Sequence, residues 1–520
     1  MYWADRLAKK IIDSKKYKPY WADDMKTPSG RVHVGSLRGV LSHDLIYKAL
    51  LDAGKRATFS FVIEDHDPMD GLPVYLDQAK YRKYLGMPLN QVPSPEPGYS
   101  SYAEYYAKDF IEVFNGLGAK PKIIWVSKLY QAGKMNEGIK KVLDAAPKIR
   151  KIYKEISGSE KPSDWYPFQV VCPKCGKLTT QVTDWDGKQV KFRCLPHLFE
   201  WAQGCNHEGK ISPFDGTGKI PWKVEWAVKW MVIGVTIEGA GKDHMSKGGS
   251  HDISSIICKE VLNYPVPFAF SHEFFLLGGR KMSSSKGLGS SAREMYNLLP
   301  PEVLRFLFAR PRFNQAIDFN PGGWTIPDLF DEYDRCARAF YKKGRKSDFG
   351  RVFELSQIKT PPKEEPFYPR FRDVANYLQM PNINPVRHFT EVKGKSLTEF
   401  EKELLEERVH YAKIWLKDHA PSEAVFFISK DLPKEAKKLS DEQRIYLQKL
   451  AELLEKKWPS SADELQTVLY NLVKERGIKS TKAFEAIYRV LIGKTHGPKA
   501  AWLIYSQDKE FVIKRFREVT

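Results

Sequence analysis

Residues 20–63, YWADDMKTPSGRVHVGSLRGVLSHDLIYKALLDAGKRATFSFVI, predict a strand, a turn, a helix and a second strand in succession. The first strand begins with a short apolar run at residues 20–22, and the turn is the Thr-Pro-Ser-Gly cluster at residues 27–30. Apolar residues recur at helical spacing over residues 34–51, and residues 57–63 form an apolar strand. This β-α-β opening predicts an α/β fold with a Rossmann-like parallel sheet and helices on its faces.

The rest of the chain divides into regions with different patterns. The alternation of strand and helix breaks at residues 76–215, which we interpret as an insertion, and resumes at residues 216–300. We therefore expect a Rossmann-like domain split between residues 1–75 and 216–300. Residues 301–370 predict stem helices and a linker, and residues 371–520 predict a basic, all-α C-terminal region. The expected helices span residues 302–309, 326–343, 397–418, 440–457 and 460–476, and residues 343–369 predict a linker or long loop.

The composition limits the class of partner and the compartment. In 520 residues, 83 lysines and arginines outnumber 64 aspartates and glutamates, which gives a formal net charge of +19. Such an excess favours a polyanionic partner such as nucleic acid, although a lysine-rich surface of the thermophilic type is the alternative explanation. We expect no membrane-spanning helix, because no apolar run is long enough, and no secretion signal. Six cysteines are too few for a disulfide scaffold and favour a reducing, cytoplasmic location.

The turn before the first helix, residues 27–36 (TPSGRVHVGS), has the features of a phosphate site. The N-terminus of a helix offers free N–H groups and a partial positive charge, which suit a phosphate. Gly30 and Gly35 allow a ligand to approach the backbone closely, and His33 can donate a hydrogen bond to a phosphate in the transition state. Taken alone, this pattern also fits an ordinary helix-capping turn.

A second candidate phosphate site lies far downstream at residues 278–287 (GGRKMSSSKG). Two glycines lead into a basic loop whose two lysines and three hydroxyls can hold a polyphosphate. Such a loop can close on its ligand when charge develops during a reaction. A solvated basic turn is the alternative interpretation when this stretch is taken alone.

Four of the six cysteines predict a metal site. Cys172 and Cys175 form a CxxC knuckle, and Cys194 and Cys205 follow within the same insertion. Two such pairs brought together by a β-ribbon would bind zinc tetrahedrally, and the alternatives are buried thiols or a redox pair. The neighbouring His197 and His207 could replace a cysteine or bind a second ion. We favour four cysteines and a structural zinc, because no vacant ligand position is implied.

Together, the two candidate phosphate sites resemble the HIGH and KMSKS signatures of class I aminoacyl-tRNA synthetases. The matching residues are 33–36 (HVGS) and 281–286 (KMSSSK). Further stretches are similar to class I lysyl-tRNA synthetases of the archaeal type, so that the resemblance covers nearly the whole chain: residues 221–226 (PWKVEW), 241–244 (GKDH), 248–250 (GGS), 301–307 (PEVLRFL), 316–319 (AIDF) and 493–498 (GKTHGP). The chain departs from the signatures at two positions. Ser36 ends the first one, and Ser284 stands where the second usually has a lysine, with Lys286 two places later.

The resemblance implies ligation of L-lysine to tRNA(Lys) through a lysyl-adenylate formed with ATP, which Mg²⁺ accompanies. It implies that His33, Lys281 and Lys286 are catalytic, with the share of each lysine left open. The implied ATP-binding residues are Ser29, Gly30, His33, Gly35, Ser36, Lys281, Met282, Ser283, Ser284 and Lys286. The implied lysine-binding residues are Asp24, Gly30, Trp222, Glu225, Asp243 and His244, and any of the three acids could bind the ε-ammonium group.

The resemblance also assigns a role to each region. The split Rossmann-like domain is expected to carry catalysis, the zinc-bearing insertion to hold the acceptor end of the tRNA, and the C-terminal helices to bind the anticodon. Three alternative hypotheses stay open: a class I synthetase for glutamate or arginine, a small-molecule adenylyltransferase, and an RNA-binding zinc protein with a decayed synthetase core.

Overall fold

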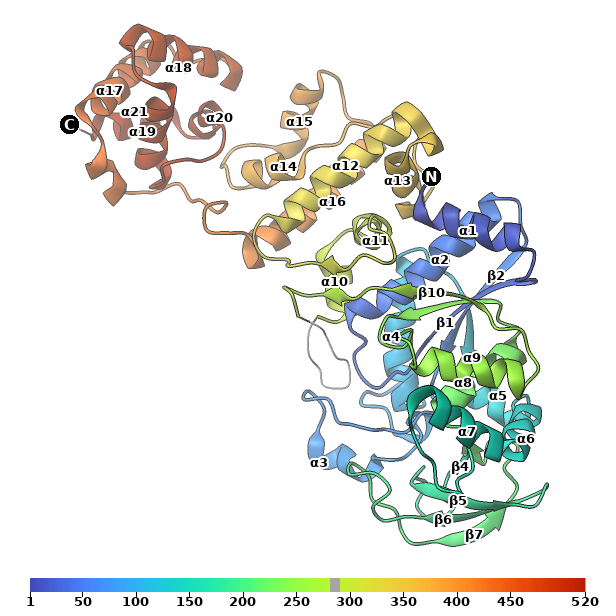
Figure 1. Ribbon diagram of the computed structural model, residues 1–520. Coiled ribbons are helices and arrows are strands. Elements are labelled where there is room, and N and C mark those ends of the chain that lie inside the picture. The colour runs from blue at the N-terminus through green and yellow to red at the C-terminus, as the bar shows by residue number, and fades with distance from the viewer. Residues whose placement is uncertain (281–289, 520) are drawn as a thin grey trace. The chain divides into compact units, whose positions relative to one another are not determined.

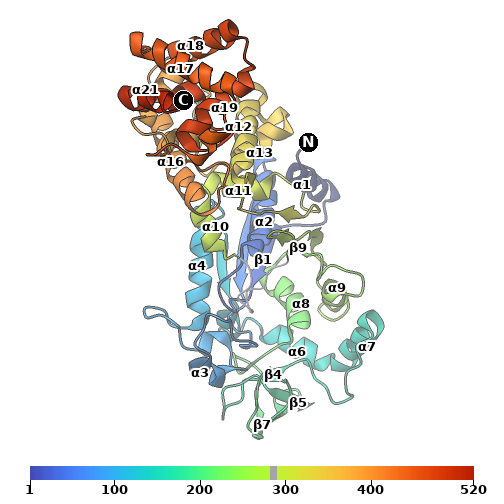
Figure 2. The ribbon, with the colours of Figure 1, turned by 90° about the vertical axis from the view of Figure 1, so that its left-hand side faces the viewer.

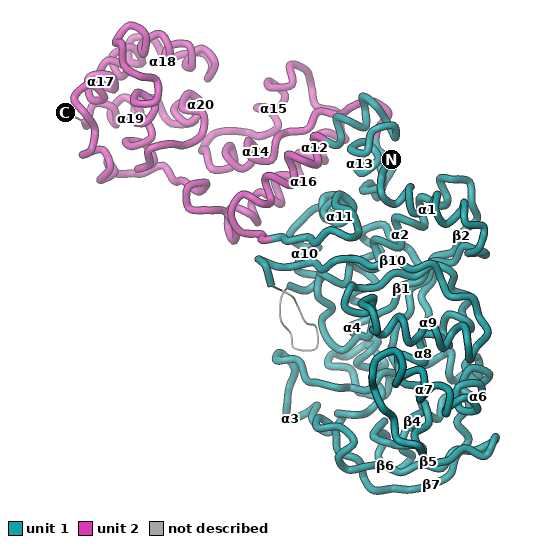
Figure 3. The backbone as a smooth tube through the Cα atoms, viewed as in Figure 1, with its two compact units in different colours: residues 1–319, 336–361 teal, residues 320–335, 362–520 magenta. Residues whose placement is uncertain are grey.

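The computed structural model describes residues 1–280 and 290–519. The chain divides into two compact units (Figure 3). Unit 1 consists of residues 1–319 and 336–361, and unit 2 of residues 320–335 and 362–520.

The centre of unit 1 is a five-stranded, fully parallel sheet with the strand order β10-β9-β1-β2-β3 (Figure 1). The strands are β1 (Tyr20–Lys26), β2 (Ala57–Ile63), β3 (Lys122–Trp125), β9 (Ile237–Gly241) and β10 (Phe268–His272). The chain builds outward from β1 to β3 and then adds β9 and β10 on the other side of β1. The strand order therefore reverses between β1 and β9. In open α/β sheets, ligands bind outside the carboxyl ends of the strands at this switch point.

The β-α-β opening predicted from residues 20–63 is confirmed. A single 3₁₀ turn, η1 (Val34–Ser36), leads from the 27–36 loop into helix α2 (Leu37–Asp52). Helix α2 ends before Gly54, whose φ of 72° is left-handed and therefore suits glycine. The sheet, its helices and the all-helical C-terminal region together confirm the expected fold class.

Helices cover both faces of the sheet. Figure 2 shows α8 (Trp222–Ile233) and α9 (Ser250–Glu260) together on one side of β1, and α4 (Tyr102–Gly116) on the opposite side. Alternation of side chains along a strand sends neighbouring residues of β1 to opposite faces. As a result, Asp23 faces α8, where it interacts electrostatically with Lys229, and Asp24 faces α2 next to Gly39.

Between β3 and α8 the chain forms a helical segment and a small antiparallel ribbon. The helices are α5 (Val126–Gln131), α6 (Asn136–Asp144) and α7 (Ala146–Ser157), and β4 (Gln169–Val170) pairs with β8 (Gly218–Lys219). The ribbon consists of β5 (Thr180–Trp185), β6 (Val190–Cys194) and β7 (Glu208–Ile211). The large sheet takes its edge strand β3 from within residues 76–215, and β3 pairs with β2.

Unit 2 is helical throughout the part that the structure describes. The helices predicted at residues 397–418, 440–457 and 460–476 are α16 (Glu399–Asp418), α17 (Asp441–Lys456) and α18 (Ala462–Arg476). The others in unit 2 are α14 (Phe371–Leu378), α15 (Pro385–Lys393), η5 (Lys434–Lys438), α19 (Ser480–Ile492), α20 (Ala500–Tyr505) and α21 (Lys509–Arg517). The predicted helix at residues 326–343 is α12 (Thr325–Lys343), which the division between the units crosses. Among all described helices, none has the length and apolar character that crossing a membrane requires.

The prediction of a linker or long loop at residues 343–369 is wrong for residues 348–356, which form helix α13 (Asp348–Ser356). The buried Arg351 holds this helix with ion pairs to Asp5 (2.9 Å) and Asp52 (2.7 Å). Arg305, in α11 (Pro301–Ala309), donates a hydrogen bond of 2.6 Å to the carbonyl of Leu355. These partners lie far away in the sequence, so local polarity gave no sign of them.

Candidate active site and metal centre

The 27–36 loop begins at the carboxyl end of β1, next to the switch point. Three hydrogen bonds fix it: Thr27 Oγ1 donates to Asp67 Oδ2 (2.6 Å), Tyr102 Oη to the Ser29 carbonyl (2.9 Å), and the Arg31 amide to Tyr75 Oη (2.5 Å). His33 then occupies the N-cap position of η1. The turn that the sequence predicts to bind phosphate is therefore held in one conformation at the place where such folds bind ligands.

The second predicted phosphate site, with Lys281, Met282, Ser283, Ser284 and Lys286, lies outside the described residues. The residues that follow it contact the first site directly. The Val34 amide donates to the Ser290 carbonyl (3.0 Å), the Ala292 amide donates to the Val32 carbonyl (2.8 Å), and His33 and Ser291 form an antiparallel β-bridge. Two segments nearly 260 positions apart thus meet beside His33.

The carboxyl end of β9 contributes the third part of the site. His244 follows β9, and its ring lies 5.5 Å from the ring of Trp222 and 6.3 Å from that of Trp226, both in α8. Trp222 is 44% exposed, so this aromatic group is open to solvent. Burial lowers the pKa of Lys26 at the end of β1, and the negative charge of Asp243 opposes that change, which places Asp243 near the switch point.

Asp24 lies apart from these aromatic residues, on the α2 side of the sheet. A Cβ atom at Gly39 of α2 would stand 2.5 Å from Asp24 Oδ2, so only glycine allows this close approach. Loss of solvation raises the pKa of Asp24 to about 7. The structure therefore brings Trp222, Asp243 and His244 to one end of the sheet and places Asp24 and Glu225 on opposite faces.

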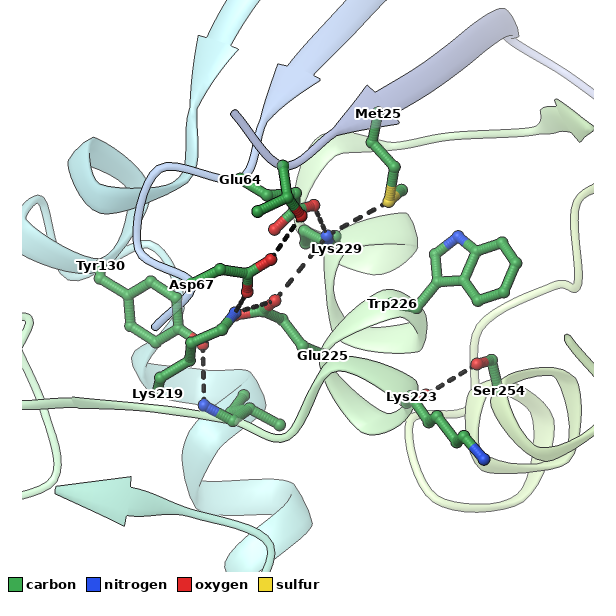
Figure 4. Close-up of polar contacts among 12 residues, drawn as sticks. Met25, Glu64, Asp67, Tyr130, Lys219, Lys223, Glu225, Trp226, Lys229 and Ser254 are labelled. Atoms are coloured by element: carbon green, nitrogen blue, oxygen red, sulfur yellow. Dashed lines mark hydrogen bonds and ion pairs between the residues drawn. The ribbon is translucent and has the colours of Figure 1, made fainter. Parts of the chain in front are cut away.

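A buried charge cluster, in which Asp67 is only partly buried, covers the α8 face of the sheet (Figure 4) and consists of Glu64, Asp67, Lys219, Glu225 and Lys229. Lys219 forms ion pairs with Glu225 and with Asp67 (3.1 Å). Lys229 forms ion pairs with Glu64 and, at 3.8 Å, with Glu225. The two lysines therefore lie between three carboxylates that would otherwise repel one another.

Glu225 is at the centre of this charge cluster. Its Oε1 accepts a hydrogen bond from Tyr130 Oη (2.5 Å), and its Oε2 accepts one from Lys219. Glu64, Asp67 and Glu225 have carboxylate oxygens within 4.8 Å of one another, the arrangement of a possible metal site. Because Lys219 and Lys229 already neutralise these oxygens, we interpret the cluster as an ion-pair network.

Two more buried acids lie beside the cluster, and the sequence analysis missed both. Asp23 of β1 and Glu238 of β9 are register partners across the switch point. The indoles of Trp226 (2.7 Å) and Trp230 donate to Glu238, and Ser60 donates to Asp23 Oδ1. The available signal in the sequence was an acidic residue within each of these two strands.

The α8 face thus holds five carboxylates, four of them buried, against two buried ammonium groups. Within the described part of the chain, Asp23 Oδ2 and Glu64 Oε2 have no hydrogen-bond partner. Burial raises the pKa of Glu64 to about 7 and that of Glu238 to about 8, and burial together with Glu238 raises the pKa of Asp23 well above its usual value. On this face, burial therefore favours the protonated, neutral forms of Asp23, Glu64 and Glu238.

The four predicted zinc ligands come together in the insertion. All four Sγ atoms lie within 4.8 Å of one another, with 3.7 Å between Cys172 and Cys205 and 3.6 Å between Cys175 and Cys194. Zn–S bonds of about 2.3 Å at tetrahedral angles give S–S separations of about 3.8 Å, whereas a disulfide requires about 2.05 Å. The cluster is therefore compatible with a tetrahedral zinc ion.

The surroundings of the thiols also fit this metal. The Cys205 amide and Thr179 Oγ1 each lie 3.3 Å from Cys194 Sγ, where they can hydrogen-bond a thiolate. A Cβ atom at Gly204 would stand 2.9 Å from the same sulfur, so glycine is needed there. Among the described residues, neither His197 nor His207 belongs to this ligand group.

An open parallel sheet with a loop and a helix start at its switch point is the architecture of an α/β protein that binds its ligand at this edge of the sheet. The family model described as "tRNA synthetases class I (K)" matches residues 1–359, and the model "Anticodon binding domain" matches residues 382–520. The lysine–tRNA ligase of Methanocaldococcus jannaschii is 34% identical, with 99% of each chain covered. That of Methanosarcina barkeri is 33% identical, with 100% of this chain and 98% of the relative covered. The chain therefore belongs to the class I lysyl-tRNA synthetase family.

A solved structure is also similar over most of the chain. The glutamate tRNA ligase from Elizabethkingia meningosepticum covers 96% of this chain and 99% of its own, at 15% identity and a TM-score of 0.44. This level of similarity is too low to carry an argument.

The first prediction concerns the buried acid Asp23. Because its folded-state pKa is raised, the unfolded chain loses this proton above a pH of about 4 while the folded chain keeps it, so stability falls as pH rises. We expect Asp23→Asn, which resembles the protonated acid, to unfold at a higher temperature than the wild type, with a difference that grows from pH 5 to pH 8. Thermal unfolding followed by circular dichroism measures this. The exposed Asp13→Asn is the control, and parallel pH profiles for Asp23→Asn and wild type would contradict the prediction.

The second prediction concerns the four cysteines. We expect about one zinc ion per chain, and we expect Cys175→Ser to lose it together with a lower unfolding temperature. Elemental analysis of the purified protein and thermal unfolding test this, with Cys258→Ser as the control at a cysteine outside the cluster. Full zinc content in Cys175→Ser would show that the cluster does not hold the ion.

Proposed function

We propose that this chain activates L-lysine with ATP and transfers the lysyl group from lysyl-adenylate to the terminal adenosine of tRNA(Lys). The observation that carries this proposal is the full-length similarity to lysine–tRNA ligases, at 34% identity with 99% of both chains covered. The 27–36 loop at the switch point supports the activation step. The anticodon-binding family model over residues 382–520 supports a tRNA partner, as does the net charge of +19.

For ATP, we propose that the two signature segments bind the triphosphate from two sides. His33 donates to the α-phosphate as charge develops, and Lys281 and Lys286 neutralise the departing pyrophosphate. The other proposed contacts are Ser29, Gly30, Gly35, Ser36, Met282, Ser283 and Ser284. Mg²⁺ bound with ATP supplies further positive charge. The protein's contribution is to orient the lysine carboxylate in line with the bond that breaks.

For lysine, we propose a pocket beside Trp222 and His244, with Gly30 at its edge and Asp24, Glu225 and Asp243 as candidate carboxylates. Both oxygens of Glu225 are engaged, so an incoming ammonium group would replace Lys219 or Lys229 there. An ammonium group that enters the α8 face can pair with acids that burial otherwise favours in the neutral form, whereas the carboxylate of a glutamate side chain would add a further buried anion without a partner.

The other regions receive supporting roles in this proposal. Cys172, Cys175, Cys194 and Cys205 hold a structural zinc that stabilises the ribbon of the insertion, residues 76–215, which contacts the acceptor end. Residues 1–75 and 216–300 form the catalytic domain, residues 301–370 the stem, and residues 371–520 the anticodon-binding region. The cytoplasm is the proposed location, since the substrates and the reduced cysteines belong there.

The third prediction tests the amino-acid specificity. With purified tRNA present, we expect pyrophosphate exchange and aminoacylation with L-lysine, and neither reaction with glutamate or arginine. The measurements are ATP–pyrophosphate exchange and acid-stable charging of tRNA, with each amino acid in turn. Exchange driven by glutamate or arginine would replace the proposal with one of the neighbouring specificities, and ATP binding without exchange would favour a decayed core.

The fourth prediction tests the role of His33. We expect His33→Ala to lower the rate of lysyl-adenylate formation at least about tenfold, because one charge-directed hydrogen bond to the transition state is lost. The unfolding temperature should stay near that of the wild type. His410→Ala, at an exposed histidine of α16, is the matched control. Pyrophosphate exchange at the wild-type rate in His33→Ala would remove this residue from the mechanism.

A further inference from the structure

Phe427 is highly exposed to solvent on the surface of unit 2, in the segment between α16 and α17. Its side chain is 79% exposed, the largest value among the exposed large hydrophobic side chains that the structure describes. The preceding residue, Phe426, is buried. Two aromatic residues of the neighbouring helices, Trp415 in α16 and Tyr446 in α17, belong to the core.

Hydrogen bonds from other helices fix the backbone on both sides of Phe427. Before it, Lys494 Nζ donates to the carbonyls of Ser422 and Val425, both at 2.5 Å, and Gln379 pairs with the Ala424 carbonyl (3.1 Å) and the Phe426 amide (2.9 Å). After it, the buried Arg515 donates to the carbonyls of Ser429 (3.0 Å) and Lys430 (2.7 Å), and the Ser429 amide donates to the Leu491 carbonyl (2.9 Å). The phenyl ring therefore projects from a segment that is already ordered in the folded protein, so binding a ligand there costs little further conformational entropy.

Lys494 belongs to the GKTHGP stretch, residues 493–498, which the proposed catalytic site does not use. The ammonium group of Lys494 donates to two carbonyls of the segment before Phe427. Residues 493–498 therefore help to hold the backbone that carries the exposed ring. A Cβ atom at Gly493 would stand 3.3 Å from Pro433, so residues 493–498 also lie against the segment after Phe427.

The chain that follows Phe427 is rich in lysine. Between Phe427 and α17 the chain carries Lys430, Lys434, Lys437 and Lys438 against Asp431 and Glu435. Lys434–Lys438 form the single turn η5, which packs against α19. An aromatic face beside lysines is the combination with which proteins bind unpaired nucleic-acid bases: the ring stacks on the base and the lysines attract the backbone.

We propose that Phe427 is a stacking platform for an unpaired base of the tRNA anticodon loop. The proposal rests on the proposed function, which makes tRNA the partner, and on the match of residues 382–520 to an anticodon-binding domain. A flat hydrocarbon ring offers stacking without hydrogen bonds, so it holds a base in place and leaves the choice of base to polar neighbours.

Paired substitutions test the platform. Phe427→Leu keeps an apolar side chain and removes the aromatic face, and Phe427→Trp keeps a face. We expect Phe427→Leu to raise the KM for full-length tRNA(Lys) about tenfold with kcat nearly unchanged, because base stacking is lost. We expect Phe427→Trp to stay near the wild type. Ile445→Ala, at another exposed apolar residue of unit 2 (51% exposed), is the control and should leave the KM unchanged.

A truncated substrate separates anticodon stacking from other effects. On an acceptor-stem minihelix without an anticodon loop, Phe427→Leu and the wild type should have the same KM. An unchanged KM for full-length tRNA in Phe427→Leu, or an equal rise on the minihelix, would overturn the proposal. So would a loss of self-association in Phe427→Leu without any change toward tRNA, which would identify a protein interface instead.

A fluorescence measurement keeps this test independent of the proposed function. In Phe427→Trp, addition of full-length tRNA should quench the fluorescence of the new indole, measured against the wild type, and the minihelix should not. If the wild type charges no tRNA with lysine, the proposed function fails while the quenching still reports on stacking. If charging succeeds without quenching, only the stacking platform fails.

Discussion

The pairing of β1 with two parallel neighbours, β2 on one side and β9 on the other, is the constraint on which the catalytic unit depends. Strand order reverses at β1, so the segments that follow β1, β2 and β9 converge at one end of the sheet. Those segments carry His33, Glu64 and His244, which the sequence separates by up to 211 positions. The backbone arrangement of the sheet is therefore what places these three residues at the same edge.

The buried charge cluster connects strand β8 to helix α8 and to the end of β2. Lys219 comes from β8, which follows the insertion, and it forms ion pairs with Asp67 after β2 and with Glu225 in α8. Removing one partner from such a network leaves a buried charge without compensation, which is more costly than the net gain from the intact pair. The network therefore fixes how β8 joins the α8 face, and that face has more acids than ammonium groups.

Cationic side chains have a different use in unit 2. Arg408 of α16 forms a bidentate pair with Asp334 of α12, and Arg515 and Lys494 donate to backbone carbonyls of an irregular segment. Arg515 and Lys494 satisfy carbonyls that have no helical partner, and Arg408 compensates the buried carboxylate of Asp334. Part of the chain's large positive charge is thus structural, which explains why net charge alone identifies a class of partner and cannot locate the binding surface.

The sequence by itself determined the β-α-β opening, the long C-terminal helices and the set of four cysteines, because each depends on a local pattern: strand and helix periodicity, turn residues, or the spacing of a metal knuckle. It also contained both phosphate-binding signatures, and their roles stay predictions. Only the tertiary structure decided that β3 completes the large sheet, that residues 348–356 are helical through Arg351, and that Asp23 faces Glu238 across the switch point. These features depend on partners that are distant in the chain. Burial raises the pKa of Asp23, and Tyr130 and Lys219 occupy both oxygens of Glu225. Both effects result from the packing of distant segments, which no local sequence pattern contains.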